Sequence, residues 1–249
     1  MSPAGGPPST GGAGRRLPGP RAAEVALRWP DACRLVPSRF PPVSLFERVA
    51  DPADLDVVHA IEALGNPRLR EAVGELALVP PDQRISGPGT SAIMAAFTHL
   101  NPEGSRFSDG SYGVYYAAAA LETAVAEVSH HRARFLSRTR EAAIDLDLRC
   151  YRVGVSARLR DLRGRHGAAH APLYHPDSYA ASQAFGSRLR AEGAAGIAYD
   201  SVRHAGGQCV ALFTPQATVP PARQAEHVGL RWDGQRISGW YTKSDVTPL

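Results

Sequence analysis

The stretch of residues 105–135, SRFSDGSYGVYYAAAALETAVAEVSHHRARF, constrains the fold more than any other part of the chain. Its first residues, rich in Ser, Asp and Gly, predict a loop. The uncharged run GVYYAAAAL predicts a short buried strand over residues 113–118 that leads into a helix. From Leu121 onward the apolar residues recur with the period of a helix. The chain must therefore pass from loop to strand to helix within this one stretch.

Polar residues of interest fall on each of these three elements. Arg106 lies in the loop, and Tyr115 and Tyr116 lie in the strand. Glu127 lies at the rim of the apolar face of the helix, whereas Glu122 lies roughly 140° away around the same helix. A carboxylate at such a rim is partly desolvated, which is a setting in which carboxylates acquire catalytic roles. Taken singly, each of these residues is more often a surface charge or a core tyrosine.

Composition narrows the class of protein. The chain has 249 residues, of which 43% are hydrophobic and 21% are charged, and this is enough for one sizeable soluble domain. Lysine and arginine exceed the acids by 28 − 24 = 4, a mild excess that permits an anionic ligand but does not require nucleic acid. Three widely spaced cysteines support neither a zinc site nor a disulfide framework. Without a long apolar run or a signal-peptide core, we expect a cytoplasmic protein that does not contact the membrane.

The rest of the chain predicts an α+β fold with a mixed or antiparallel β core and surrounding helices. We expect residues 1–42 to be a disordered or extended N-terminal segment, with a short helix possible over residues 21–28, and residues 43–249 to form one domain. Besides 113–118, the expected strands are 43–49, 143–155, 196–202 and 208–213. The expected helices are 91–100 and 178–192, the second capped by Asp177 or Ser178 and ended by Gly193. Residues 156–176 predict a long loop, and the Asp233–Gly234 step predicts a C-terminal hairpin.

Two further sets of residues, a pair of aspartates and three histidines, are possible functional sites. Asp145 and Asp147 share one face of the expected strand, so an acidic catalytic pair is conceivable, although a solvent-facing strand edge is far more common. Three histidines, His166, His170 and His175, lie in the expected long loop. Their spacings do not match a helical metal-binding pair, so we predict no metal site.

The runs RFSDGSYGVYYAAAALETAVAEV and YDSVRHAGGQCVALF resemble the RES domain family, which is named for an arginine, a glutamate and a serine. The resemblance implies that Arg106, Glu127 and Ser201 are these three residues. It also implies that Tyr116 is the aromatic residue that follows the family arginine. Arg48 resembles an additional, earlier arginine of the family's site.

Many members of this family are toxins of bacterial toxin–antitoxin pairs that consume NAD and have a fold similar to that of ADP-ribosyltransferases. The resemblance therefore implies that residues 43–249 are a catalytic domain that cleaves the nicotinamide–ribose bond of NAD, by hydrolysis or phosphorolysis, as the toxin of a type II toxin–antitoxin system. NAD would be the substrate and not a cofactor, and the partner would be a cognate antitoxin. The implied catalytic residues are Glu127, Arg106 and Ser201, and the implied NAD-binding residues are Arg48, Arg106, Tyr115, Tyr116 and Ser201.

Two alternatives stay open at this point. The same site could transfer ADP-ribose to a protein or a nucleic acid, because the two reactions differ only in the acceptor. The high isoelectric point, about 9.2, and the arginine-rich region 132–165 also allow a non-enzymatic nucleic-acid-binding module. The basic residues are scattered, however, and no recognised nucleic-acid-binding motif is present.

Overall fold

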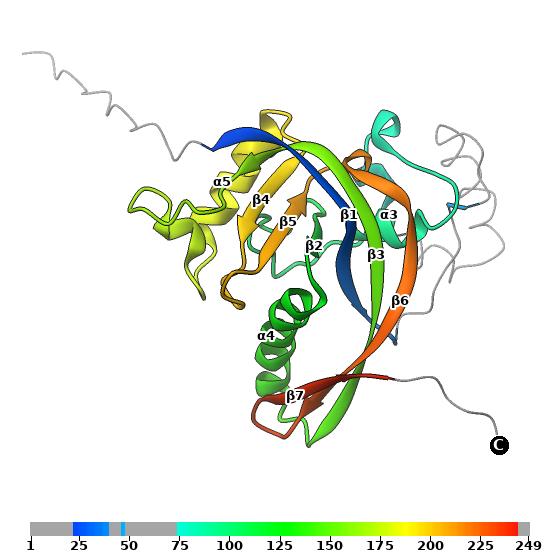
Figure 1. Cartoon of the computed structure of the whole chain (residues 1–249), viewed down its shortest axis with the longest axis vertical. Coiled ribbons are helices and arrows are strands. Elements are labelled where there is room, and N and C mark those ends of the chain that lie inside the picture. Colours follow the sequence, from blue (N-terminus) through cyan, green and yellow to red (C-terminus); the bar gives the residue numbers. More distant parts are fainter. Residues whose placement is uncertain (1–21, 40–45, 48–73, 244–249) are drawn as a thin grey trace, which may run out of the picture.

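The computed structural model describes residues 22–39, 46–47 and 74–243. It contains one seven-stranded sheet with helices on both of its faces (Figure 1). The strands are β1 (Ala23–Pro37), β2 (Tyr115–Ala118), β3 (Ile144–Asp161), β4 (Gly196–Asp200), β5 (Gln208–Leu212), β6 (Thr218–Trp232) and β7 (Ile237–Thr242). The helices are α3 (Ser91–Thr98), α4 (Leu121–Thr139) and α5 (Ala180–Ala191), with short 3-10 turns at Leu76–Leu78, Pro81–Gln83, Ala171–Tyr174 and Pro215–Ala217.

The strand order is β1-β2-β5-β4-β3-β6-β7, and an additional pairing of β1 with β3 closes the first five strands into a ring. Only β3 and β4 run parallel; the other pairs are antiparallel. In Figure 1 the long strands β1, β3 and β6 arch over the shorter strands β2, β4 and β5. The predicted α+β class with a mixed sheet is confirmed.

The first described segment corrects the prediction for the N-terminal region. The helix expected over residues 21–28 is wrong, because Ala23–Pro37 forms a strand that pairs with β3 along most of its length. The register between the two strands shifts between Trp29 and Ala32, so Pro30 lies at a bulge, where a residue without an N–H group is tolerated. Residues 23–37 are therefore part of the sheet, and the folded domain begins before residue 43.

Most of the other predicted elements are confirmed, with shifted ends. The strand expected over 143–155 continues to Asp161, so the first part of the expected loop 156–176 is strand. Of the strand expected over 43–49, only residues 46–47 lie within the described ranges, and they form a bend outside the sheet. The hairpin of β4 and β5 and the C-terminal hairpin of β6 and β7 are both present.

The start of α5 also differs from the expectation. Tyr179 is the N-cap residue of the helix, and no side chain makes a capping hydrogen bond there. Instead, His175 Nδ1 accepts hydrogen bonds from the backbone N–H groups of Asp177, at 3.1 Å, and Ser178, at 2.9 Å. The two residues expected to provide a capping oxygen therefore provide backbone donors to a histidine. Gly193 ends the helix as predicted, with φ of 78°.

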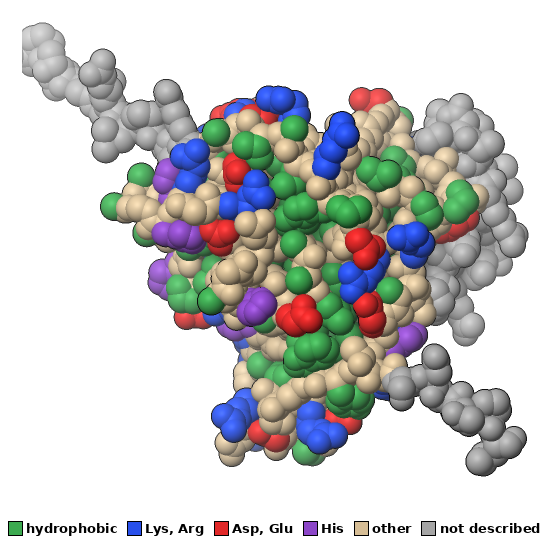
Figure 2. All heavy atoms as spheres, viewed as in Figure 1, with side chains coloured by type: hydrophobic (Ala, Val, Ile, Leu, Met, Phe, Trp, Pro, Cys, Tyr) green, Lys and Arg blue, Asp and Glu red, His purple; other side chains and the backbone are tan. Residues whose placement is uncertain are grey.

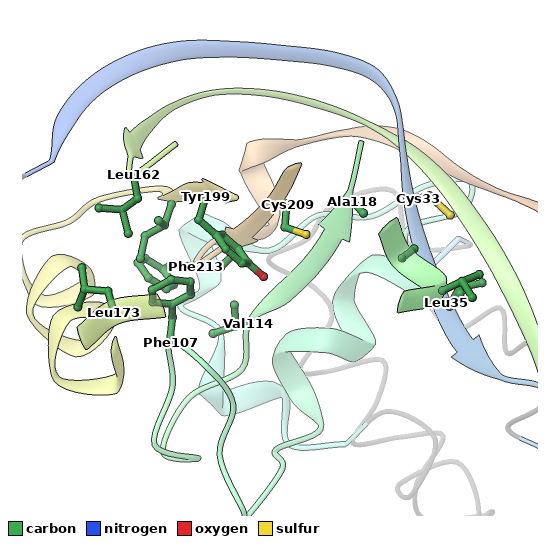
Figure 3. Close-up of a cluster of buried hydrophobic side chains, with 14 of the residues drawn as sticks. Cys33, Leu35, Phe107, Val114, Ala118, Leu162, Leu173, Tyr199, Cys209 and Phe213 are labelled. Carbon is green, nitrogen blue, oxygen red and sulfur yellow. The ribbon is translucent and has the colours of Figure 1, made fainter. Parts of the chain in front are cut away.

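Two hydrophobic cores lie on opposite faces of the shorter strands. One core includes α3 with Phe97, and the other is covered by α4 and α5. Figure 3 shows part of the second core, in which Tyr199 lies between the aromatic rings of Phe107 and Phe213 and the thiol of Cys209. The Phe107 and Tyr199 rings meet edge to face, with centroids 5.0 Å apart.

Acidic and basic side chains alternate on the outer face of the long strands (Figure 2). Asp145 contacts Arg231 at 3.5 Å, and Asp147 contacts Lys243 at 2.6 Å. Both carboxylates are exposed, so they form surface ion pairs and not an acidic catalytic pair. Across the described ranges, no helix is both long enough and apolar enough to cross a membrane.

Gly186 allows α5 to pack directly against the loop that carries Arg106. A Cβ atom at this position would overlap the carbonyl oxygen of Phe107. We expect Gly186→Ala to lower the free energy of unfolding by about 1–3 kcal/mol through overpacking, even though alanine favours a helix. Urea unfolding measures this change. Gly167→Ala is the matched control, because a Cβ there meets no atom within 4 Å; equal stabilities of the two variants would contradict the packing.

Candidate active site

Glu127 and Ser201 meet although they are far apart in the sequence. Ser201 follows the last residue of β4, and its Oγ donates to Glu127 Oε1 over 2.6 Å. The same Oγ accepts the backbone N–H groups of Arg203, at 3.1 Å, and His204, at 3.0 Å. Because these two donors occupy the lone pairs of the hydroxyl, its hydrogen is directed at the carboxylate. Two of the predicted site residues are therefore joined directly.

The helix α4 sets the direction of Glu127. Thr123, Ala124 and Val125 are buried against the sheet, Glu127 is half-buried, and Glu122 is exposed. The two glutamates thus lie on different faces of the helix, as the helical period predicts. In the described part of the chain, Glu127 Oε2 has no hydrogen-bond donor. One oxygen of this carboxylate is thus held by Ser201, and the other is open to a ligand.

Arg106 is almost fully buried, with 5% of its surface exposed. Its Nη1 donates to the backbone carbonyls of Leu173 and His175, both at 3.1 Å, and its guanidinium stacks on the Tyr179 ring at 4.7 Å. Its Nη2 is buried without a hydrogen-bond partner. The side chain therefore holds the segment 171–179, which we call the strap, and keeps one N–H donor unpaired.

The two adjacent tyrosines point to opposite faces of β2, as successive strand residues must. The Tyr116 hydroxyl bonds to Ser105 Oγ at 2.8 Å and accepts the Phe107 N–H at 2.9 Å, so it fixes the loop on either side of Arg106. Tyr115 is fully buried in the other core, where its ring stacks against Phe97. Of the two tyrosines expected to bind NAD, Tyr116 therefore lies beside the loop that carries Arg106, and Tyr115 lies in the other core.

Arg203 is a site residue that the sequence analysis did not single out. It lies in the turn between β4 and β5, with 15% of its side chain exposed. Its Nη2 donates to His130 Nε2 at 2.9 Å and to the Pro176 carbonyl oxygen, and it lies 3.9 Å from Asp177 Oδ1. It joins α4 to the strap. The signal in the sequence was its place two residues after Ser201, in a turn that returns to the sheet.

The surroundings of Glu127 combine buried neutral groups with positive charge. Burial, and secondarily the carboxylate of Glu127, raises the pKa of the Cys209 thiol. Desolvation and then the charges of Arg203 and Arg106 lower the pKa of His131; the residue is exposed at the surface, so the two charges are the firmer cause. A neutral thiol and a neutral imidazole beside two guanidinium groups favour an anionic ligand at this position.

Arg48, expected as a further anion-binding residue, lies outside the described residues. Arg34 on β1 is another internal cation. Desolvation lowers the pKa of its guanidinium, whose Nη1 donates to the Tyr116 carbonyl at 3.2 Å and which stacks on the Tyr115 ring at 4.7 Å. The segment around it was expected to be disordered or extended, so the sequence analysis did not identify this residue.

A groove of about 390 Å³ lies elsewhere, between β1, β3 and β6. Its lining includes Trp29, Val219 and Pro221 with Arg28 and Arg223, and it contains none of the site residues described above. The groove is therefore separate from the candidate site around Glu127. Among the described residues, no three His, Cys, Asp or Glu side chains converge as they would around a metal ion.

The bond between Arg203 and His130 predicts a pH effect on stability. An arginine only donates, so His130 Nε2 must accept and the ring must be neutral. Burial and the Arg203 charge lower the pKa of His130 below its usual 6.5. The unfolded chain therefore binds a proton that the folded chain does not, and stability falls as the pH drops through 6.5.

We expect His130→Gln, which keeps an acceptor but does not titrate, to reduce the fall in Tm between pH 7.5 and pH 5.5. Differential scanning calorimetry at several pH values measures it. His227→Gln, at an exposed position on β6 with no arginine as its hydrogen-bond partner in the described ranges, is the control for the loss of a histidine, and its effect on the slope should be smaller. The same slope in wild type and His130→Gln would contradict the neutral histidine.

Comparisons with known proteins identify the family of the chain. Residues 81–233 match the family described as RES domain. The uncharacterized protein y4oC of Sinorhizobium fredii (strain NBRC 101917 / NGR234) is 33% identical over 226 residues, which cover 90% of this chain and 91% of that protein. The crystal structure of the M. tuberculosis MbcT–MbcA toxin–antitoxin complex is similar with a TM-score of 0.40 and 15% identity, over 84% of this chain and 86% of that chain. With a family match over more than half of its length, the chain belongs to the RES domain family.

Proposed function

We propose that this protein degrades NAD by cleaving its nicotinamide–ribose bond. The observation that carries the proposal is the half-buried Glu127 carboxylate, which Ser201 holds by one oxygen. The other oxygen has no partner among the described residues. A fixed carboxylate with a free oxygen suits the stabilisation of positive charge that develops in a reaction.

The chemistry needs little from the protein beyond such a carboxylate. When the bond between C1′ of the ribose and the nicotinamide nitrogen breaks, both bonding electrons stay with the nitrogen. The positively charged pyridinium thus leaves as neutral nicotinamide, and no proton has to be supplied to it. The ribose becomes oxocarbenium-like, and Glu127 would stabilise that charge. Water or phosphate then attacks C1′; for water, the excess proton passes to solvent.

The other site residues would orient the substrate. Arg106 has a buried guanidinium with one unpaired N–H donor, which suits an oxygen of the substrate's phosphates. Ser201 would act through Glu127, because its short hydrogen bond fixes one oxygen of the carboxylate. Tyr116 holds the loop around Arg106, so its first role would be to position that arginine.

Purified protein incubated with NAD tests the proposal. We expect release of nicotinamide, with ADP-ribose as the second product if water is the acceptor and ADP-ribose 1″-phosphate if phosphate is the acceptor. No loss of NAD at high enzyme concentration would overturn the proposal. Label from NAD that ends on a protein or a nucleic acid, with little free ADP-ribose, would assign the site to ADP-ribosyl transfer instead.

Replacing Glu127 tests its role directly. Glu127→Gln keeps the size of the side chain but removes the charge, so we expect turnover of NAD to fall by about two to four orders of magnitude. Folding should change little, because Ser201 can still donate to the amide oxygen. Steady-state kinetics with circular dichroism of each variant measures both effects.

The matched control is Glu122→Gln, an exposed carboxylate on another face of α4, which should keep near-normal activity. If Glu122→Gln loses activity while Glu127→Gln retains it, the catalytic carboxylate has been assigned wrongly.

We further propose that the protein acts as the toxin of a toxin–antitoxin pair, in which a cognate antitoxin blocks the site. This proposal rests on membership of the RES domain family. Expression in a bacterial host should deplete NAD and stop growth, and Glu127→Gln should allow normal growth. High expression with full NAD turnover and unimpaired growth would remove the toxin role and leave the enzymatic one.

A further inference from the structure

Arg106 and Arg203 hold neighbouring peptide groups of the strap. Arg106 Nη1 donates to the His175 carbonyl, and Arg203 Nη2 donates to the next carbonyl, that of Pro176. The two guanidinium groups therefore bind carbonyls of adjacent residues in the strap. The two arginines come from different segments, the loop before β2 and the turn after β4, and converge on one point of the chain.

Each of these arginines leaves one buried N–H donor without a partner, Nη2 of Arg106 and Nε of Arg203. A buried donor of a charged group costs free energy when it is unpaired. The nearest carboxylate of the strap, Asp177, is 74% exposed and lies 3.9 Å from Arg203 Nη2, so it does not satisfy Nε. Glu127 is held by Ser201 and has no hydrogen bond to either guanidinium.

The two arginines also act on a common neighbour. Apart from desolvation, Arg203 and Arg106 make the largest contributions to the lowered pKa of His131. The neutral imidazole adds no positive charge, whereas two guanidinium groups lie around it. Such a place favours a compact dianion that can accept from two guanidinium groups at once, because the N–H forks of arginine match phosphate oxygens.

We propose that Arg203 is a second phosphate-binding residue of this site. Its Nε, together with Arg106 Nη2, binds oxygens of a pyrophosphate group, while its Nη2 keeps the strap against α4. The identity of the ligand rests on the proposed function, in which the pyrophosphate is that of NAD. Ser201 links this arginine to the carboxylate, because its Oγ accepts the backbone N–H of Arg203 and donates to Glu127.

Kinetics with two substrates test this inference, since NAD contains the pyrophosphate and nicotinamide riboside contains no phosphate. We expect Arg203→Gln to raise KM for NAD about tenfold to hundredfold, the loss typical of one charge-assisted hydrogen bond. The KM for nicotinamide riboside should not change. Arg203→Lys keeps the charge but not the Nε donor, so the rise in its KM for NAD should be intermediate.

Arg163→Gln is the matched control. Arg163 is similarly buried, at 23% exposed, and is paired with Asp161 at 2.8 Å. Its loss should reduce stability without a change in KM for NAD. If Arg203→Gln lowers kcat equally for both substrates and leaves both KM values unchanged, Arg203 only holds the strap and the inference is wrong.

Calorimetric titration with ADP-ribose separates this inference from the proposed function, because it needs no turnover. Wild type should bind ADP-ribose, and Arg203→Gln should bind it about tenfold or more weakly. If NAD is not cleaved but this difference is found, the proposed function fails and the phosphate site stands. If NAD is cleaved but ADP-ribose binds the wild type and Arg203→Gln equally well, only the phosphate site fails. Should Arg203→Gln not fold, the same comparison with Arg203→Lys decides.

Discussion

The strand β3 determines where nearly everything else in this protein lies. It pairs with β1, with β6 and, through its last residues, in parallel with β4. Because β4 is fixed in this way, the turn that follows it begins at a set position, and that turn carries Ser201 and Arg203. The glutamate arrives by another route, on the helix that follows β2. The candidate site thus forms where the turn after β4 meets the helix after β2.

The internal arginines show how positive charge is kept inside the fold. Arg106, Arg203 and Arg34 each donate to a backbone carbonyl, and Arg106 and Arg34 also stack on tyrosine rings. Within the described part of the chain, only Arg203 of the three lies near a carboxylate, the exposed Asp177 at 3.9 Å. Carbonyls and ring faces stabilise a cation without cancelling its charge. Other arginines pair with acids, as Arg152 on β3 does with Glu226 on β6. The positive charge of the three internal guanidinium groups is therefore largely uncancelled in the folded protein.

Local pattern was enough to predict α4, the position of Glu127 on it and the two hairpins. Alternation identified most of β3, and the family resemblance singled out Ser201, whose hydroxyl bonds to Glu127 in the structure. Three features could not be read in this way. Pro30 suggests that secondary structure is interrupted at this position. Only the pairing with β3 shows that residues 23–37 form a strand with a bulge. Arg106 binds the strap through the backbone carbonyls of residues 173 and 175, and bonds to backbone carbonyls cannot be recognised in a sequence. Likewise, only the packed structure shows Arg203 against His130.

The Tyr115–Tyr116 dipeptide has a further consequence. One ring is part of the core beside α3, and the hydroxyl of the next holds the loop beside the other core. A shift of this short strand by one residue would exchange the two rings and damage both cores at once. Because both cores depend on the register of this one strand, we expect them to unfold in a single cooperative transition, together with the candidate site.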